Sequence, residues 1–203
     1  MKRLFLLAVA AMLLGFVEPA RAPHAVAEDE QHLVGQFLVA TPEMADPRFE
    51  ESVIYMISHD QTGAMGLVIN RPVAEGPLAD LLKGLGHESQ GAKGTVAIHF
   101  GGPVETERLF ILHSNDYAAK ATTFVGNGLG VTSDAGILQA IARGKGPRQK
   151  LFIFGYAGWG PGQLEGEIKT GAWFSIPAEI SLIFDEDAES KWNKAMAKRK
   201  FRT

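Results

Sequence analysis

The sequence contains no cysteine, and this absence excludes several kinds of chemistry at once. A chain without thiols forms no disulfide, offers no thiolate nucleophile and binds no metal through sulfur. Attachment of a lipid at an N-terminal cysteine, as in bacterial lipoproteins, is excluded as well. The absence indicates no particular compartment, because a chain without cysteine is compatible with oxidising and reducing surroundings alike.

An excess of positive charge is also missing. The 203 residues include 20 Lys and Arg against 23 Asp and Glu, which gives a formal net charge of −3. Domains that bind nucleic acid usually carry a basic face, so no nucleic-acid partner is expected. The histidines do not occur in the H-x-x-x-H or H-E-x-x-H spacings of zinc sites. We therefore predict no metal site and no cofactor.

The N-terminus has the three-part pattern of a secretory signal peptide. Lys2 and Arg3 precede an apolar stretch over residues 4–17, which is short for a membrane span. Small residues typical of cleavage sites end at Ala22 and at Ala27. We predict that residues 1–27 are a signal peptide cleaved after Ala27, because cleavage after Ala22 would leave a proline first. An uncleaved anchor and a misassigned start codon are the alternatives.

Cleavage after residue 27 would remove three cations and one anion and change the formal charge from −3 to −5. The mature protein would then be exported, into the periplasm of a bacterium, and would keep no stable membrane anchor. A more acidic mature chain is even less suited to binding nucleic acid.

The remaining residues, 28–203, have ordinary globular composition and predict one domain of class α+β. Apolar runs bounded by turn residues predict strands over 33–40, 53–57, 65–70, 95–100, 108–114, 121–125, 151–154, 173–176 and 180–184. Helical spacing and caps predict helices over 77–85, 135–143, 162–168 and 188–200. Several connections are too short for parallel crossovers. We therefore expect a mixed, largely antiparallel sheet flanked by helices, in which 95–100 pairs with 108–114 and 173–176 pairs with 180–184.

The most distinctive stretch is the glycine-rich segment 155–165, GYAGWGPGQLE. It lies between a predicted strand and a predicted helix, an arrangement that can bind phosphate through backbone N–H groups. Its glycine spacing is neither that of a Walker A loop nor that of a dinucleotide-binding turn, and it has no serine for a nucleophile elbow. The pattern is compatible with a ligand groove walled by Trp159, Gln163 and Glu165. The more common arrangement for such a segment is a tight turn in which backbone packs on backbone and Trp159 fills the core.

Two other pairs of residues could line such a groove. Gly101 and Gly102 follow a predicted strand and would line the groove if the fold brings them beside segment 155–165. Asn70 and Arg71 end another predicted strand and could contact an anion, with capping of a turn as the alternative. The predicted ligand-binding residues are therefore Asn70, Arg71, Gly101, Gly102, Gly155, Gly158, Trp159, Gly160, Gln163 and Glu165. His99 and His113 lie on strands expected to pair, where a buried or capping role is the more common one.

Several segments together resemble the YqgE/AlgH family of bacterial proteins. They occur in order from about residue 35 to the C-terminal helix, at residues 37–42, 46–49, 52–55, 63–72, 100–104, 112–114 and 155–165. The resemblance implies a branched, partly barrel-like mixed sheet flanked by helices. It implies no established activity; the family carries a transcriptional-regulator label connected with alginate production. Most members resemble cytoplasmic proteins, so the cytoplasm is the alternative to export.

From these patterns we expect a non-enzymatic binding or accessory protein with a groove near the 155–165 turn. Its partner would be a protein or a small molecule. One alternative is an enzyme that acts on a small anionic substrate through Asn70, Arg71 and the glycine turns. The other is a transcriptional regulator, which salt-dependent DNA binding would reveal.

Overall fold

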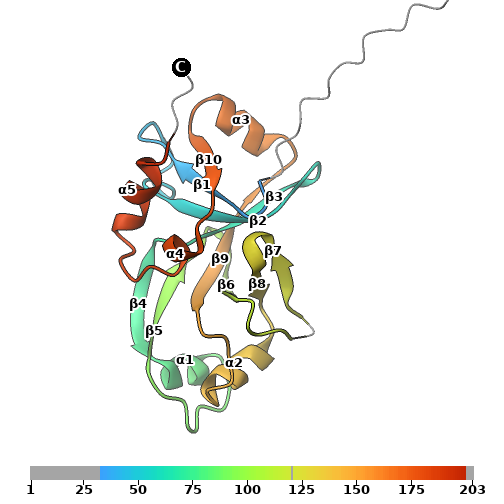
Figure 1. Ribbon diagram of the computed structural model, residues 1–203, viewed down its shortest axis with the longest axis vertical. Coiled ribbons are helices and arrows are strands. Elements are labelled where there is room, and N and C mark those ends of the chain that lie inside the picture. The colour runs from blue at the N-terminus through green and yellow to red at the C-terminus, as the bar shows by residue number, and fades with distance from the viewer. Residues whose placement is uncertain (1–32, 120, 200–203) are drawn as a thin grey trace, which may run out of the picture. The chain divides into compact units, whose positions relative to one another are not determined.

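The computed structural model describes residues 33–119 and 121–199 (Figure 1), so the predicted signal peptide lies outside the described residues. Within the described part, the strands are β1 (Gln36–Ala40), β2 (Val53–Asp60), β3 (Gly63–Val68), β4 (Pro72–Pro77), β5 (Thr95–Phe100), β6 (Val104–Ser114), β7 (Thr123–Val125), β8 (Leu129–Thr132), β9 (Lys150–Trp159) and β10 (Trp173–Pro177). The helices are α1 (Leu78–Gly84), α2 (Ala135–Ala142), α3 (Gln163–Lys169), α4 (Ile180–Ile183) and α5 (Ser190–Met196), with a 3-10 turn, η1, at Gly126–Gly128. None of these helices is long and apolar enough to cross a membrane.

The strands form one curled, mostly antiparallel sheet that makes a half-barrel and branches at β9 (Figure 1). The main path runs β10-β1-β2-β3-β9-β6-β8-β7, and β4 and β5 join it through a parallel pairing of β5 with β9. The residues of β9 at 157–159 pair with β3, and those at 152–154 pair with β5. The two halves of β9 therefore belong to two segments of the sheet. The predicted α+β class with a partly barrel-like sheet is confirmed.

Glycines make the branch point possible. Gly155 bends β9 with a φ of 74°, a conformation that glycine adopts without steric cost. A Cβ at Gly101 would overlap the carbonyl of Gly155, and one at Gly102 would overlap the backbone of Tyr156. Gly101 also connects the two segments, because its N–H donates to Phe154 (2.8 Å) and its carbonyl accepts from Val68 (3.0 Å).

Contacts between η1 and the start of β1 hold the half-barrel together. Gly35 and Gly126 pack so closely that a Cβ on either would overlap the backbone of the other. The Tyr55 hydroxyl donates to the Gly126 carbonyl, and Asn127 Nδ2 donates to the Gly35 carbonyl at 2.8 Å. Burial raises the pKa of Tyr55 to about 12, so its hydroxyl remains a donor.

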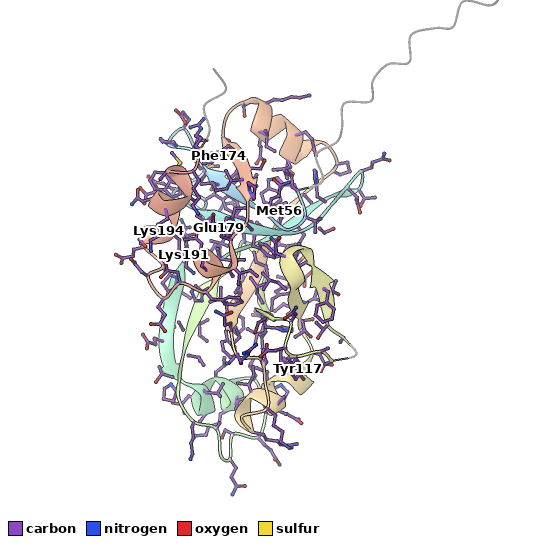
Figure 2. All side chains as sticks on the ribbon, in the orientation of Figure 1. Met56, Tyr117, Phe174, Glu179, Lys191 and Lys194 are labelled. Atoms are coloured by element: carbon purple, nitrogen blue, oxygen red, sulfur yellow. The ribbon has the colours of Figure 1, made fainter. Side chains whose placement is uncertain are left out.

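Three apolar clusters surround this sheet. The largest lies within its curl and includes Phe37, Tyr55 and Phe110, with residues of α4 and α5 covering it. A second lies beneath α3. A third lies between α1, α2 and the parts of β6 and β9 that face these two helices. Lys191 of α5, labelled in Figure 2, is fully buried, and its Nζ donates to the carbonyls of Ile69 (3.1 Å) and Ile183 (2.7 Å). Burial lowers the pKa of Lys191 to about 8.

Two strands are present that the sequence patterns do not predict. β4 begins at Pro72, where the preceding strand was expected to end. It pairs only with β5, and an edge strand tolerates proline because one row of its backbone groups faces away from the sheet. β8 spans only Leu129–Thr132, and its Gly130 interrupts the apolar run that would indicate a strand.

Two predicted pairings are wrong. Residues 180–183 form the short helix α4, and β10 pairs with β1. Four consecutive residues of mostly apolar character fit a strand and a buried helical turn equally well. β5 and β6 do not pair either, because β9 lies between them. His99 is consequently opposite Ile153, and His113 is opposite Lys150.

The glycine-rich segment differs from the predicted loop. β9 continues to Trp159, so the first five residues of the segment belong to the strand. Only residues 160–162 make the turn into α3. The strand can continue because β3 becomes its partner beyond the bend at Gly155.

Candidate functional site

A bulge interrupts β6 at residues 105–108. The pairing with β9 shifts register between the Val104–Tyr156 pair and the Leu109–Phe154 pair. Within the bulge, Glu105 has a φ of 46°, a left-handed conformation that costs a non-glycine residue roughly 1 kcal/mol or more. Bulges re-aim side chains and occur often beside functional sites. This bulge places Arg108 between two hollows of the surface.

The Arg108 guanidinium is held by three contacts. It lies over the Phe110 ring, with 4.8 Å between Cζ and the ring centroid. Its Nη1 donates to Glu105 Oε2 at 2.9 Å, and its Nη2 donates to Ser133 Oγ at 3.3 Å. The Arg108 and Glu105 side chains are 49% and 48% exposed, and an ion pair this exposed contributes about 0–1 kcal/mol. Arg108 is therefore oriented yet accessible to a ligand.

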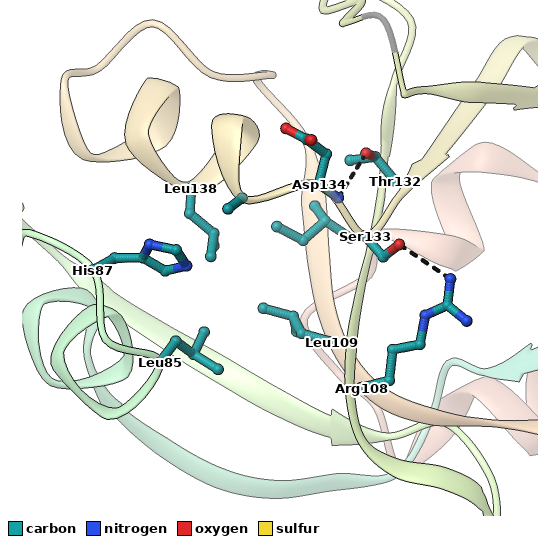
Figure 3. Close-up of a pocket in the computed structure, with 10 residues that line it drawn as sticks. Leu85, His87, Arg108, Leu109, Thr132, Ser133, Asp134 and Leu138 are labelled. Carbon is teal, nitrogen blue, oxygen red and sulfur yellow. Dashed lines mark hydrogen bonds between the residues drawn. The ribbon is translucent and has the colours of Figure 1, made fainter.

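Beside Arg108 lies the first hollow, the inner pocket, with a volume of about 220 Å³ (Figure 3). It opens between the end of α1, β6 and the start of α2. Its apolar lining is Leu85, Leu109, Ile111, Ala135 and Leu138, and its polar lining is His87, Arg108, Thr132, Ser133 and Asp134. Figure 3 shows the His87 imidazole entering from the side opposite Arg108.

The carboxylate of Asp134 interacts with helix α2 rather than with the pocket. Its carboxylate accepts a hydrogen bond from the Gly136 N–H at 2.7 Å and so caps α2. The Asp134 N–H donates to Thr132 Oγ1 at 3.2 Å (Figure 3). The side chain next to it, Ser133, is the one that contacts Arg108.

Two more hollows lie near the inner pocket. The middle pocket, about 370 Å³, shares Arg108, Thr132 and Ser133 with the inner pocket. The outer pocket, about 430 Å³, shares Ser58 and Met65 with the middle pocket. The middle and outer pockets adjoin at Ser58 and Met65 and are together called the groove below. The inner pocket lies on the other face of β6, because successive strand residues point to opposite faces: Leu109 and Ile111 line the inner pocket, whereas Phe110 lines the middle pocket. The walls of the groove come from β2, β3 and the end of β9 on one side, and from β6, β7 and β8 on the other.

Two of the predicted ligand-binding residues, Gly158 and Trp159, line the outer pocket. The Trp159 side chain is nevertheless mostly buried and stacks on Phe49 with ring centroids 6.5 Å apart. Its indole N–H donates to Glu167 Oε2 at 2.9 Å, and the Trp173 indole donates to the same oxygen at 2.8 Å. Trp159 thus both fills the second cluster and presents an edge to the groove.

Gly160, Gln163 and Glu165 have local partners. Gln163 Oε1 accepts from the Gly160 N–H at 3.1 Å, while its Nε2 donates to Glu167 Oε1 at 2.9 Å. These bonds close the turn before α3. His59 Nδ1 accepts from the Leu33 N–H at 3.3 Å, so Nε2 carries the proton and donates to Glu165 at 2.7 Å. This hydrogen bond lowers the pKa of Glu165.

Asn70 and Arg71 bind the backbone of the loop before β2. Asn70 accepts from the Val53 N–H and donates to the Glu51 carbonyl, both at 2.8 Å. Arg71 donates to the carbonyls of Arg48 and Glu50, the second at 2.7 Å. Both side chains cap that loop, which is the alternative that the sequence leaves open for them.

The fold does bring Gly101 and Gly102 beside segment 155–165, as the groove hypothesis requires. The approach is between backbones, at Gly155 and Tyr156, and neither Gly101 nor Gly102 is in the lining of the three pockets. Among the residues that the structure describes, no group of three or more His, Asp or Glu side chains is placed to hold a metal ion.

The groove is lined by residues that the sequence patterns do not single out, chiefly Arg108 and Ser133, and Glu105 binds Arg108 beside it. One signal is visible in retrospect: the four polar residues at 105–108 interrupt the alternation of a strand. That signal marks a bulge only when the register with β9 is known. Ser133 and Arg108 are 25 residues apart in the chain, so only the fold shows their contact.

Comparisons with known proteins agree with this architecture. A family described as AlgH-like matches residues 37–203. A UPF0301 protein of Methylococcus capsulatus is 46% identical over 86% of this chain and 95% of its own length. Another, from Rhodospirillum rubrum, is 42% identical over 87% of this chain and 92% of its own length.

Two solved structures are also similar. The solution structure of AlgH from Pseudomonas aeruginosa is 38% identical, with a TM-score of 0.73 over 85% of this chain and 92% of that one. A crystal structure of a Corynebacterium diphtheriae protein shares the fold at 23% identity, with a TM-score of 0.65 over 82% of this chain and 87% of that one. The chain therefore belongs to the AlgH-like family of UPF0301 proteins.

Proposed function

We propose that this protein is a non-enzymatic binding protein whose groove takes an extended segment of a partner protein. The observation that carries the proposal is that the middle and outer pockets adjoin, sharing Ser58 and Met65 in their walls. A compact ligand would need one pocket, whereas a chain laid along the surface would use both.

The chemistry of the lining suits a peptide. The middle pocket is lined by apolar side chains such as Ile57, Met65 and Val125 and by the hydroxyl-bearing residues Ser58, Thr123 and Thr132. Peptides are recognised by such a combination, in which apolar pockets take alternate side chains and polar groups bind the backbone. Methionine suits a peptide surface because its flexible thioether adapts to different shapes.

The polar groups favour binding over catalysis. The hydroxyl at the pocket junction, Ser133 Oγ, accepts a hydrogen bond from the cation Arg108, whereas an activated nucleophile is paired with a general base. The enzyme alternative relies on Asn70 and Arg71, and those side chains are engaged with the loop at residues 48–53. The shape and polarity of the groove then determine which partner binds.

The proposal is tested with short random peptides displayed on phage through their C-termini and selected on the immobilised protein. Selected peptides are then labelled, and their dissociation constants are measured by fluorescence anisotropy. We expect Ser58→Trp, which places a large ring on the wall shared by two pockets, to raise the dissociation constant about tenfold or more. Val73→Trp is the matched control, because Val73 is 62% exposed on β4, outside the groove lining.

Failure to select any peptide would reject the proposal. So would selected peptides whose affinity is equally weakened, or equally unaffected, by Ser58→Trp and Val73→Trp.

A further inference from the structure

We infer that the partner segment carries an acidic side chain, aspartate or glutamate, which binds Arg108 on the wall of the middle pocket. This inference rests on the proposed function and specifies its partner: an extended segment in which a carboxylate is flanked by apolar residues.

The charge of the groove is the first observation. Among the described residues that line the middle and outer pockets, Arg108 is the only charged one, and the others are apolar, aromatic, glycine or hydroxyl-bearing. Complementary charges across an interface determine which partner binds and in which register. A single cation among uncharged walls therefore favours a segment that brings one negative charge to this point.

The guanidinium and the apolar part of the middle pocket face the same way. Residues 108 and 110 of β6 are two apart, and the Arg108 Cζ lies 4.8 Å from the centroid of the Phe110 ring, which lines this pocket. Beside them, Ile57, Met65 and Val125 also line the pocket and pack against the apolar cluster within the curl of the sheet. An apolar residue next to the acidic one would thus extend an existing core.

The hydrogen-bonding capacity of Arg108 is only partly used. A guanidinium has five N–H donors. Two of them donate within the described part of the protein, one to Glu105 at 2.9 Å and one to Ser133 at 3.3 Å (Figure 3). Because the side chain is 49% exposed, water can serve the other three. A segment laid in the groove would displace this water, and a buried donor without an acceptor is costly, so the segment must supply acceptors.

A carboxylate suits this position better than a phosphate. Its two oxygens match two parallel N–H groups of a guanidinium. Phosphorylated segments are recognised by clusters of arginine, whereas the groove has one. Glu105 does not prevent the contact, because it lines neither pocket and its exposed pairing with Arg108 is weak.

The test uses the full-length protein and three pools of short fluorescein-labelled peptides, all with a C-terminal amide. The central residue is glutamate, glutamine or lysine, and the other positions are drawn at random from alanine, threonine, valine and leucine. Fluorescence anisotropy gives the dissociation constant of each pool. We expect the glutamate pool to bind about tenfold more tightly than the glutamine pool, and the lysine pool to bind most weakly. Arg108→Gln should make the glutamate and glutamine pools bind equally.

A second variant gives a result that damage to the fold cannot produce. Arg108→Glu reverses the charge of the groove, so the lysine pool should bind it roughly tenfold more tightly than the glutamate pool. Arg148→Gln is the matched control, because Arg148 is 86% exposed, pairs with Asp116 and lies outside the groove lining. It should keep the preference for glutamate.

The inference is overturned if no pool binds, if the glutamate and glutamine pools bind equally, if Arg108→Gln keeps the preference, or if Arg148→Gln removes it. A phosphoserine pool that binds more tightly than the glutamate pool would overturn the assignment to a carboxylate. If phage-selected peptides still bind in a manner sensitive to Ser58→Trp while the glutamate and glutamine pools do not differ, the proposed function stands and this inference fails.

Discussion

His99 illustrates how the fold controls the protonation of a single side chain. Its imidazole is 5% exposed on β5, and no described residue pairs with its Nδ1. Burial, and after it the ammonium group of Lys191, lowers the pKa of His99 to about 4. A histidine in an unfolded chain titrates near 6.5. Between these two values the unfolded chain binds a proton that the folded chain does not, so the folded state loses stability as the pH falls.

We predict that His99→Phe removes much of this acid sensitivity. The depressed pKa corresponds to a loss of about 2 kcal/mol of unfolding free energy between pH 7.5 and pH 5. When both proteins are unfolded by urea at the two pH values, the unfolding free energy of the wild type should fall by this much more than that of the variant. Tryptophan fluorescence can follow the transition. Equal losses in the two proteins would show that another group is responsible.

At the scale of elements, α3 is joined to the sheet by one carboxylate. Glu167 accepts hydrogen bonds from the indoles of Trp159 on β9 and Trp173 on β10, and from the amide of Gln163 within α3. The two indoles belong to the apolar cluster beneath the helix, where an unpaired N–H is costly. Trp159 of the glycine-rich segment therefore positions α3 and also lines one wall of the groove.

We predict that Glu167→Ala lowers the free energy of unfolding by about 3 kcal/mol, because it leaves two buried indole donors without an acceptor. Gln163→Ala, which removes one exposed partner of the same carboxylate, should cost less than about 1 kcal/mol. Urea denaturation of both variants at neutral pH measures the difference. Similar costs for the two substitutions would mean that the indole hydrogen bonds contribute little.

The elements that the sequence predicts correctly are those with strong local signals. The helix after Asp134 has a capping side chain and regular apolar spacing, and it is found at Ala135–Ala142. The pairing of β5 with β9 joins residues about 54 positions apart in the chain, such as His99 and Ile153. Local patterns carry no information on such a pairing, so the short connection between β5 and β6 suggests a hairpin that β9 prevents.

The same distinction applies to the candidate site. The glycine-rich segment is visible because its composition is unusual, and it does supply Gly158 and Trp159 to the groove. Arg108 is an ordinary residue in the sequence and becomes distinctive only through the strained bulge at Glu105. Ligand binding by the ten predicted residues stays a prediction, and the groove adds Arg108 and Ser133 to the residues worth testing.

At the scale of the domain formed by residues 33–199, the groove follows from the branching of the sheet. The segment with β2 and β3 supplies one wall, and the segment with β6, β7 and β8 supplies the other. β9 belongs to both segments and bends between them at Gly155. A sheet without this bend would be continuous and would offer a flatter face. The branch-point glycines thus contribute to the groove by shaping it rather than by contacting a ligand.

The AlgH-like match covers residues 37–203 and does not include the predicted signal peptide. We propose that residues 1–27 direct export and predict that the mature chain begins at Glu28 in the periplasm of a Gram-negative host. Expression of the full chain with a C-terminal tag, followed by osmotic shock and mass spectrometry of the N-terminus, measures both points. Leu6→Arg should block export, because a charge within the apolar stretch prevents its insertion.

Ala27→Lys tests the cleavage position, because a large charged residue beside the cut should stop processing after Ala27 or shift it to Ala22. A tagged protein that keeps Met1 and stays in the cytoplasm with or without Leu6→Arg would contradict export. If export holds, the protein is separated from the chromosome, and the transcriptional-regulator alternative fails for this chain. The partner segment in the groove would then belong to another exported protein.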